Sequence, residues 1–324
     1  MKKMPYKPLF DIDNEMLDLV SDIAVLIGRV KAEDVPSRHL KLRRTNRIRS
    51  IQSSLAIEGS SLSLENVTDI IEGKRVIGNP REIQEVKSAV AAYDLIDNLN
   101  PYSVDDLLKA HGKMAFGLIG LPGRFRKCGV GVYKGNVAIH IAPDHEDVPR
   151  LIEDLMDWAE SSDVHPLIKS CIFHCRFEFI HPFEDGNGRM GRLWQSLILS
   201  KWKPLFAYLP IESWVKLNQK EYYNSLMEAD KENIEVFIKY MLRMIFTAVD
   251  EFVDEITYSP KNMQEREKAI LEILSKEPQS TASEIAGILS VSDRTIKRHL
   301  SSLTEKGIIR RVGSDKTGHW EILR

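Results

Sequence analysis

Twelve consecutive residues, from His181 to Arg192, carry the side chains with the clearest chemistry in this chain. They read HPFEDGNGRMGR. His181 can accept a proton, Asp185 can hold a hard cation, and the bend Gly186-Asn187-Gly188 can expose backbone N–H groups. Two arginines three residues apart, Arg189 and Arg192, follow. These residue types at this spacing predict a site that binds a polyphosphate and deprotonates a group beside it.

Two helices and a bend must position these side chains. Apolar residues keep helical spacing up to Ile180, and Pro182 cannot comfortably continue that helix, so His181 is expected at a helix end. The apolar run from Leu193 to Leu199 predicts the next helix, whose first turn directs unpaired N–H groups back at the bend. Such a helix start binds anions, and the two arginines lie on one face of it.

Two plainer interpretations compete with this one. Gly186, Gly188 and Gly191 satisfy the G-x-G-x-x-G pattern of dinucleotide-binding folds, but that pattern must follow a buried strand and the upstream period here is helical. A lone histidine before proline, or a lone Asp-Gly pair, usually marks an ordinary turn. The joint presence of the histidine, the carboxylate and both arginines disfavours each alternative.

The same twelve residues resemble the signature of the Fic family, His-Pro-Phe-x-(Asp/Glu)-Gly-Asn-Gly-Arg-x-x-Arg, at every defined position. The similarity extends from about residue 40 to about residue 245. The resemblance implies a mainly α fold, with a Fic/Fido helical core and a small β-hairpin flap. It also implies an enzyme that transfers AMP from ATP, with Mg²⁺, to a Ser, Thr or Tyr hydroxyl of a protein, including the chain itself.

The resemblance implies a role for each signature position. His181 resembles the general base, and Asp185 resembles the ligand of the Mg²⁺ that bridges the α- and β-phosphates. Arg189 and Arg192 would hold the β- and γ-phosphates, and the side chain of Asn187 would join the bend's backbone in an anion hole. The residues assigned to ATP and phosphate binding are Asp185, Gly186, Asn187, Gly188, Arg189, Met190, Gly191, Arg192, Tyr222 and Tyr223.

A second match lies upstream, at Ser54 to Gly59. Residues 40–58 predict a helix that Gly59 ends, so Glu58 would lie at the negative end of its own helix, at a cost of about 0.3–1 kcal/mol. The segment resembles the inhibitory (Ser/Thr)-x-x-x-Glu-(Gly/Asn) motif of Fic proteins that carry an inhibitory helix before the core. The resemblance implies that Glu58 pairs with Arg192 and denies it to the γ-phosphate. Without the signature, a solvated helix end would be the better interpretation.

Alternating valine and isoleucine around a Lys-Gly-Asn turn predict a β-hairpin over residues 130–141. Its position resembles the family's flap, which aligns the target segment by main-chain pairing. The flap residues are Val137, Ala138, Ile139 and His140. A purely structural hairpin is the alternative. The preceding turn, Gly123 to Arg126, matches an arginine-containing turn of the family and receives no catalytic role.

Two adjacent tyrosines, Tyr222 and Tyr223, fall on a helix predicted through Ala229. In related proteins a similarly placed pair borders the adenine, offering a ring and a hydroxyl. This chain has Asp230 where close relatives often have Asn, which weakens that assignment. Ordinary half-buried packing is the alternative.

The chain changes character around Tyr258 to Lys261, after a long helix over about 234–256. An amphipathic helix over 265–275 comes first, and the capping box Thr281-Ala282-Ser283-Glu284 opens a second helix. Ser292 can cap a third, and strands over 308–312 and 319–323 can pair as a wing. This order resembles the winged-helix DNA-binding fold, α with a small β wing, whose third helix enters the major groove.

The charge of this module supports DNA binding only weakly. Its third helix carries Arg294, Lys297 and Arg298 on one face, but residues 262–324 hold eleven Lys or Arg against nine Asp or Glu. That excess is small for a phosphate-binding surface. Use of the module for dimerisation or target recruitment is the competing interpretation, and the N-terminal helices are further candidates for a homodimer contact.

Composition sets the remaining expectations. At 324 residues and 43% hydrophobic, the chain can bury cores for two or three domains. We expect an N-terminal helical region with the inhibitory helix at 1–100, the Fic/Fido catalytic core at 101–257 and a winged helix-turn-helix at 262–324. The net charge of −2 argues against general attraction to nucleic acid. No segment has membrane-spanning length, which together with the use of ATP predicts a cytoplasmic protein without membrane contact.

Two functions of different class follow. The first is an ATP-dependent protein adenylyltransferase restrained by Glu58. The second is a DNA-binding transcriptional regulator whose core senses nucleotide with little turnover. The intact His181 favours the first, because a pure sensor needs no base. The reverse reaction, removal of AMP with Glu58 orienting a water, would use the same site.

Overall fold

The computed structural model describes the chain except for residues 1–7, 31–39, 135–136, 258–259, 290, 292, 314–317 and 324. Its elements are predominantly α-helical, as predicted, with two small antiparallel sheets. The chain divides into two compact units, Met1–Val249 and Asp250–Arg324. The division lies inside the long helix expected near 234–256, and the finer limits at residues 100, 257 and 262 stay predictions.

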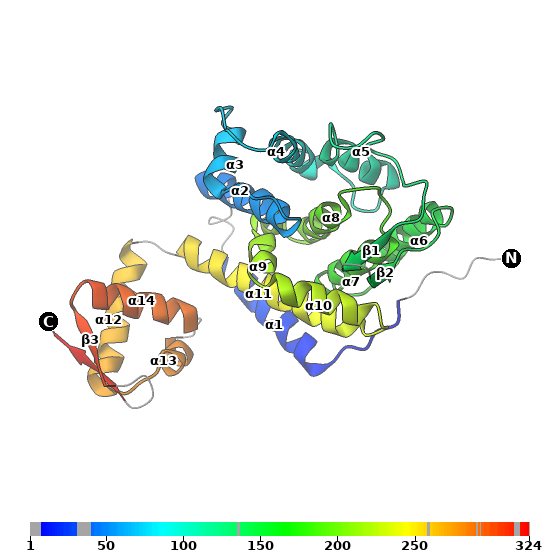
Figure 1. Cartoon of the computed structure of the whole chain (residues 1–324). Helices are drawn as coiled ribbons and strands as arrows, with labels where there is room; N and C mark the ends of the chain where they lie inside the picture. Colours follow the sequence, from blue (N-terminus) through cyan, green and yellow to red (C-terminus); the bar gives the residue numbers. More distant parts are fainter. Residues whose placement is uncertain are drawn as a thin grey trace. The chain divides into compact units, whose positions relative to one another are not determined.

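The first unit contains ten helices wholly within its described residues, two 3-10 turns and one hairpin (Figure 1). In chain order they are α1 (Asn14–Gly28), α2 (Leu40–Ile57), α3 (Leu64–Ile71), α4 (Pro80–Tyr93), η1 (Ile96–Asn98), α5 (Val104–Met114), β1 (Gly131–Lys134), β2 (Val137–Ile141), α6 (Val148–Ser161), α7 (Pro166–Ile180), α8 (Asn187–Trp202), η2 (Pro204–Tyr208), α9 (Ile211–Leu217) and α10 (Gln219–Ala229). Helix α11 (Ile234–Thr257) begins in this unit and ends in the next.

Helix α8 forms the centre of the first unit, in contact with α2, α5, α7 and η2 (Figure 1). Met190, Trp194 and Leu197 of α8 are fully buried, as are Phe173 and Phe177 of α7. Aromatic side chains of this size dominate core energetics. The signature segment is the connection between these two core helices, so its backbone is held at both ends.

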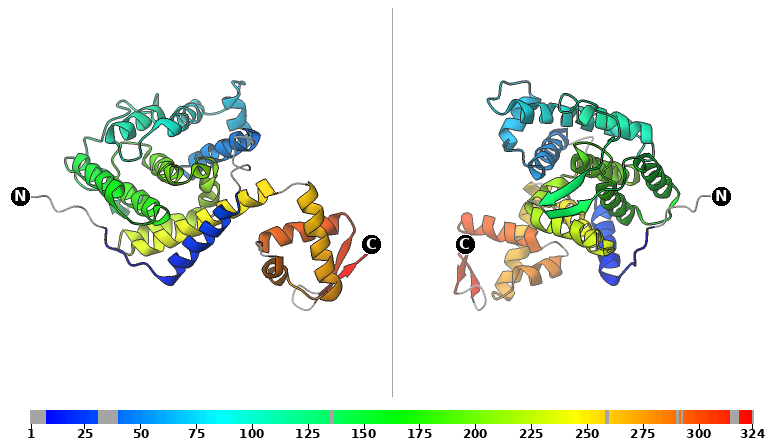
Figure 2. Two further views of the ribbon diagram at one scale, coloured as in Figure 1. Left: turned by 180° about the vertical axis from the view of Figure 1, so that it is seen from behind. Right: turned by 45° about the vertical axis from the view of Figure 1, so that its right-hand side comes forward.

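Helices α1 and α11 lie side by side on the outside of this core (Figures 1 and 2). Lys239 of α11 contacts Asp13 at 2.9 Å, and Arg243 pairs with Glu15. Asp13 also caps α1 by accepting a hydrogen bond from the N–H of Met16.

Helix α2 ends as the sequence predicts. Gly59 has φ 95°, in the left-handed region, and the N–H of Ser60 donates to the carbonyl of Leu55 at 3.1 Å. These contacts form a Schellman termination, which satisfies carbonyls at the helix end. Glu58 is therefore the first residue beyond the last helical position, where its side chain can turn toward α8.

The predicted hairpin is present as β1 and β2. Lys134 pairs with Val137 and Gly131 with Ile141, with an irregularity between Val132 and Tyr133. The turn residues Gly135 and Asn136 lie outside the described residues.

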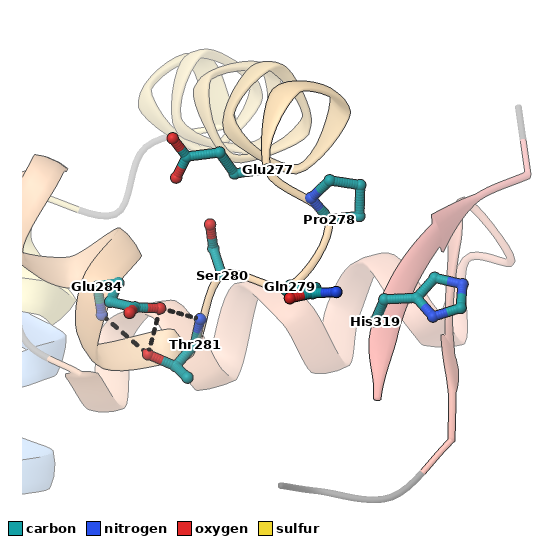
Figure 3. A pocket seen from close by; sticks show the side chains of 7 residues that line it. All are labelled: Glu277, Pro278, Gln279, Ser280, Thr281, Glu284 and His319. Carbon is teal, nitrogen blue, oxygen red and sulfur yellow. Dashed lines mark hydrogen bonds between the residues drawn. The ribbon is translucent and has the colours of Figure 1, made fainter. Parts of the chain in front are cut away.

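The second unit has the element order of a winged helix: α12 (Pro260–Lys276), α13 (Ala282–Leu289), α14 (Asp293–Glu305), β3 (Ile309–Val312) and β4 (His319–Ile322). Its core includes Ile270, Ile285, Ile296 and Leu303. The predicted capping box is confirmed, because Glu284 accepts from the N–H of Thr281 at 2.7 Å and its own N–H donates back to the Thr281 hydroxyl (Figure 3). Ser292, the predicted cap of α14, is not among the described residues.

A hollow lies beside this cap, between the loop after α12 and strand β4 (Figure 3). The N–H of Trp320 donates to the carbonyl of Pro278 at 2.8 Å and ties the wing to that loop. Across the described residues, we find no helix with both the length and the apolar character needed to cross a bilayer.

Candidate active site

His181 is held in a conformation that suits a general base. It follows α7 with φ 49° and ψ 57°, and its N–H donates to the carbonyl of Phe177 at 3.0 Å. Its Nδ1 lies 3.2 Å from the carbonyl oxygen of Glu178. A carbonyl can only accept, so Nδ1 carries the hydrogen and Nε2 keeps a lone pair. The half-buried ring can therefore accept a proton at Nε2.

Arg126 fixes the turn that carries this histidine. Its guanidinium, nearly fully buried, donates to the carbonyls of His181 (2.8 Å), Ile180 (3.3 Å) and Cys128 (2.8 Å). Its backbone N–H donates to the carbonyl of Pro182 at 2.9 Å. A non-glycine residue in the left-handed region costs about 1–3 kcal/mol, so such bonds must hold it. The sequence indicated an arginine-containing turn here but not this role.

The start of α8 forms the predicted bend with unpaired N–H groups. Gly186 has φ 87°, and the first helical hydrogen bond runs from the N–H of Met190 to the carbonyl of Gly186. The three N–H groups before Met190 therefore have no carbonyl within the helix. The amide of Asn187 both accepts from and donates to the backbone of Phe183 at 2.9 Å, so it closes the loop.

Both signature arginines are buried and keep unused donors. Their side chains are 5% (Arg189) and 2% (Arg192) exposed. Nε and Nη1 of Arg189, and Nη1 of Arg192, have no hydrogen-bond partner among the residues that the structure describes. Buried N–H donors are rarely left unpaired, and guanidinium groups bind phosphate strongly. Three such donors at one helix start indicate a site that takes an anion.

Glu58 contacts Arg192, as the inhibitory motif predicts. Its Oε1 accepts from Nη2 at 2.7 Å, and Ser54 accepts from the same guanidinium through its hydroxyl (3.1 Å) and its carbonyl (3.0 Å). Burial alone would lower the pKa of Arg192, but the charge and hydrogen bond of Glu58, together with Tyr222 and Glu178, outweigh burial, so the pKa is raised. A β-carbon added at Gly188 would lie 2.3 Å from Oε1 of Glu58. Glycine there thus admits the Glu58 carboxylate to the start of α8.

The end of α2 is tied to α10. The carbonyl of Ile57 accepts from Gln219 Nε2 at 2.8 Å and from the Tyr223 hydroxyl at 3.1 Å. The hydroxyl of Tyr222 lies 3.0 Å from His174 Nε2, and its ring is fully buried. The structure therefore uses the tyrosines assigned to the adenine as a helix anchor and a core residue, and adenine binding by them stays a prediction.

Met190 and Gly191, the two positions before Arg192 at which the signature defines no residue type, are both tightly packed. Met190 is fully buried in the core. A β-carbon added at Gly191 would lie 2.5 Å from Glu178 Oε1 and 3.0 Å from His174 Cδ2, so a larger residue there would require these side chains to shift. Phosphate binding by Met190 and Gly191 stays a prediction, since their surroundings explain them by packing.

Asp185 lies between two cations. Its Oδ1 accepts from Arg189 at 2.9 Å and its Oδ2 from Arg81 at 2.8 Å. Its carbonyl lies 3.0 Å from Nε2 of His111. Because Nδ1 of His111 accepts from the N–H of Gly123, Nε2 must be the donor to Asp185.

His111 is a support of the signature that sequence reasoning missed. It is fully buried on α5, and its ring stacks on Phe183 with centroids 3.6 Å apart. Burial lowers the pKa of His111 to about 4, so the ring is neutral at pH 7. The only available signal in the sequence was the helical spacing of His111 from the apolar residues Leu107, Ala110 and Met114.

The low pKa of His111 predicts that the fold loses stability in mild acid. The folded pKa of about 4 lies below the unfolded value of about 6.5, so the unfolded chain binds more protons between them. We expect this residue to remove about 2 kcal/mol of unfolding free energy between pH 7 and pH 5. Urea unfolding of the wild type and His111→Gln at both pH values measures it. Equal pH dependence in the two proteins would contradict a buried neutral His111.

The predicted flap residues Val137, Ala138, Ile139 and His140 lie in β2. The described hairpin has two strands, so each strand keeps an edge without a strand partner in the described sheet. The hairpin is anchored at its end, where Arg126 Nη2 donates to the carbonyl of Pro143 at 2.5 Å. Arg126 also donates to the carbonyl of His181, so one side chain ties the end of the hairpin to the His181 turn. An open strand edge is suited to pairing with an extended segment.

In the second unit, α14 exposes the predicted basic face of Arg294, Lys297 and Arg298. Each has a carboxylate nearby: Lys297 contacts Asp293 at 2.5 Å, Arg294 lies 3.9 Å from Glu251, and Arg298 lies 3.9 Å from Asp254. Counted from residue 250, the unit has twelve Lys or Arg against thirteen Asp or Glu. Acidic residues at the end of α11 thus offset the charge of this face.

Comparison with known proteins agrees with both units. A model of the Fic/DOC family matches residues 101–199, and a model described as winged helix-turn-helix DNA-binding matches residues 263–310. Among curated relatives, a protein adenylyltransferase Fic of Nematostella vectensis is 27% identical over 77% of this chain and 58% of its own length. Protein adenylyltransferase fic-1 of Caenorhabditis elegans is 27% identical over 78% and 49%. The chain spans about half the length of these curated relatives.

Solved structures extend the likeness to the whole chain. The crystal structure of a Fic family protein from Desulfovibrio desulfuricans is 40% identical, covers 98% of both chains and superposes with a TM-score of 0.73. A Fic domain containing signaling protein from Bacteroides thetaiotaomicron shares the fold at 21% identity, over 75% of this chain and 98% of its own, with a TM-score of 0.61. With its intact signature and its winged-helix unit, this chain belongs to the Fic family.

Proposed function

We propose that this protein is an ATP-dependent protein adenylyltransferase that modifies a Ser, Thr or Tyr hydroxyl and is restrained by Glu58. The observation that carries the proposal is the set of three unpaired, buried guanidinium N–H donors of Arg189 and Arg192 at the start of α8. They adjoin a turn whose histidine keeps a lone pair. Charge neutralisation and a base are the two requirements of hydroxyl attack on a nucleotide phosphorus.

The proposed step uses each group once. Nε2 of His181 takes the hydroxyl proton as the hydroxyl oxygen bonds to the α-phosphorus of ATP. The bond between the α-phosphorus and the bridging oxygen breaks, and pyrophosphate leaves with that electron pair. Arg189 and Arg192 hold the phosphates that become pyrophosphate and neutralise the charge that develops on them.

Asp185 fits the Mg²⁺ that family resemblance implies. It is a hard oxygen donor beside the phosphate site, and Mg²⁺ is commonly held by one or two carboxylates plus substrate phosphates. Within the described part of the chain, no group of three or more His, Cys, Asp or Glu side chains could hold a metal without nucleotide. When bound, Mg²⁺ would neutralise phosphate charge, and Asp185 would hold it.

Restraint by Glu58 follows from its occupation of Arg192. The carboxylate lies 2.7 Å from Nη2, where a γ-phosphate oxygen would compete for the same N–H groups. Ser54 and the ties from Gln219 and Tyr223 to Ile57 hold the helix end in register. An ATP that cannot use Arg192 would bind with its α-phosphorus out of line for attack.

Labelled nucleotide tests the activity. Protein is incubated with Mg²⁺ and ATP labelled in turn at the α- and γ-phosphates, with and without Glu58→Gly. The proposal expects protein-bound label from the α position only. Label from the γ position only would indicate a kinase-like reaction, and no label in either protein would favour a nucleotide sensor.

A second candidate, DNA binding by the winged helix, is favoured by the exposed basic face of α14. If that face binds DNA, Arg298→Ala is expected to weaken duplex binding. The slope of log affinity against log salt concentration should also become shallower by about one. An electrophoretic shift assay over a salt series measures both, with exposed Lys231 of the first unit mutated to Ala as the control. No shift at low salt would leave dimerisation or target recruitment as the role of this unit.

A further inference from the structure

The carboxylate of Asp185 is occupied on both oxygens, and the two arginines that occupy it differ in freedom. Arg189 belongs to α8, has a side chain only 5% exposed, and contacts Oδ1. Arg81 belongs to α4, has a side chain 56% exposed, and contacts Oδ2 at 2.8 Å. Arg81 also lies outside the residues that match the Fic/DOC family model.

Local sequence positions Arg81 for this contact. Asn79 caps α4 by accepting from the N–H of Arg81 at 2.9 Å, and Pro80 occupies the first helical position. The guanidinium therefore extends from the first turn of α4. Its Nε lies 3.4 Å from Glu85 one turn later, so Arg81 has a second carboxylate that can keep it when it leaves Asp185.

We propose that Arg81 is a built-in cation that occupies the metal-binding oxygen of Asp185 and must be displaced before a divalent cation can bind there. This inference rests on the proposed function, which assigns Asp185 to the metal. The N-terminal helices would then hold two charged residues of the signature with opposite charges: Glu58 at the end of α2 holds Arg192, and Arg81 of α4 holds Asp185.

The competition follows from size and geometry. Mg²⁺ and Mn²⁺ need a carboxylate oxygen at close range, on the order of 2 Å, and a guanidinium N–H directed at the same oxygen blocks that approach. Of the two arginines, the exposed one with an alternative partner is the one that can move. Because exposed ion pairs are weak, the block should be modest, and removing Arg81 should tighten metal binding roughly two- to five-fold.

Metal binding without catalysis tests this inference. Free Mn²⁺ is measured by electron paramagnetic resonance in titrations of the full chain, alone and with a non-hydrolysable ATP analogue. The site is defined as the part of the binding that Asp185→Asn removes. Arg81→Ala is compared with Arg44→Ala, which removes another exposed arginine whose carboxylate partner is Glu72. Thermal unfolding confirms that each variant is folded, and Arg81→Lys provides a milder second variant.

Tighter Mn²⁺ binding in Arg81→Ala, and not in Arg44→Ala, is the expected result. Equal or weaker binding in Arg81→Ala would overturn the inference, because Arg81 would then be neutral or supportive toward the metal. Because the described residues offer no metal site that is complete without nucleotide, the arm with the ATP analogue decides the comparison, and the affinity for the analogue is measured separately. A protein that binds no analogue would contradict the proposed function and, with it, this inference. An Arg81→Ala protein that binds the analogue but holds Mn²⁺ no more tightly would overturn the inference alone.

Discussion

Replacing His181 with alanine is expected to lower the rate of AMP transfer by about 10²- to 10⁴-fold while the affinity for an ATP analogue stays nearly unchanged. Under the proposed function, the phosphate contacts would come from the start of α8 and its arginines, whereas the histidine would contribute only the proton acceptor at Nε2. Single-turnover transfer and analogue binding, both measured in a Glu58→Gly background, separate the two quantities.

A matched histidine substitution controls for this result. His145 is partly exposed, contacts Asp144 on the surface, and lies outside the signature. His145→Ala should leave both the rate and the affinity unchanged. Transfer that survives intact in His181→Ala would show that another group takes the hydroxyl proton.

Replacing Glu58 with glycine is expected to raise the rate of auto-modification or target modification by roughly 10- to 150-fold. This range corresponds to the about 1.5–3 kcal/mol that a hydrogen bond to a charged group contributes. The substitution frees Nη2 of Arg192 for a phosphate and opens the space beside Gly188. Incorporation of α-labelled AMP into protein over time measures the gain.

Glu58→Gln is the matched control, because it keeps the size of the side chain and one acceptor oxygen but removes the charge. We expect an intermediate rate. If Glu58→Gly modifies protein no faster than the wild type, with folding intact, restraint through this residue is wrong.

The helices and their ends could be predicted because local rules decide them. Pro182 ends α7, Gly59 ends α2 with positive φ, and Thr281 caps α13, each for reasons that act within a few residues. The pairing of Glu58 with Arg192 came from resemblance to a motif, since 134 residues separate the partners. Rules based on residue spacing within a helix or turn cannot predict a contact between residues so far apart in the sequence.

The supporting residues could not be predicted for the same reason. His111 contacts a carbonyl 74 positions away and Arg81 a carboxylate 104 positions away, and neither residue type is unusual on a helix. Tyr222 and Tyr223 illustrate a related case, because family resemblance suggested the adenine, whereas their contacts to His174 and Ile57 follow from no local pattern. Partners across the fold, rather than local propensity, decide what such side chains do.

The competition between Glu58 and nucleotide for Arg192 is tested most directly by comparing the affinities of a non-hydrolysable ATP analogue and ADP. In the wild type, the two nucleotides should bind about equally, because Glu58 occupies the guanidinium that a γ-phosphate needs. In Glu58→Gly, the triphosphate should bind roughly 10-fold or more tightly than ADP. The same ratio in both proteins would contradict the claim that Glu58 and the γ-phosphate share Arg192.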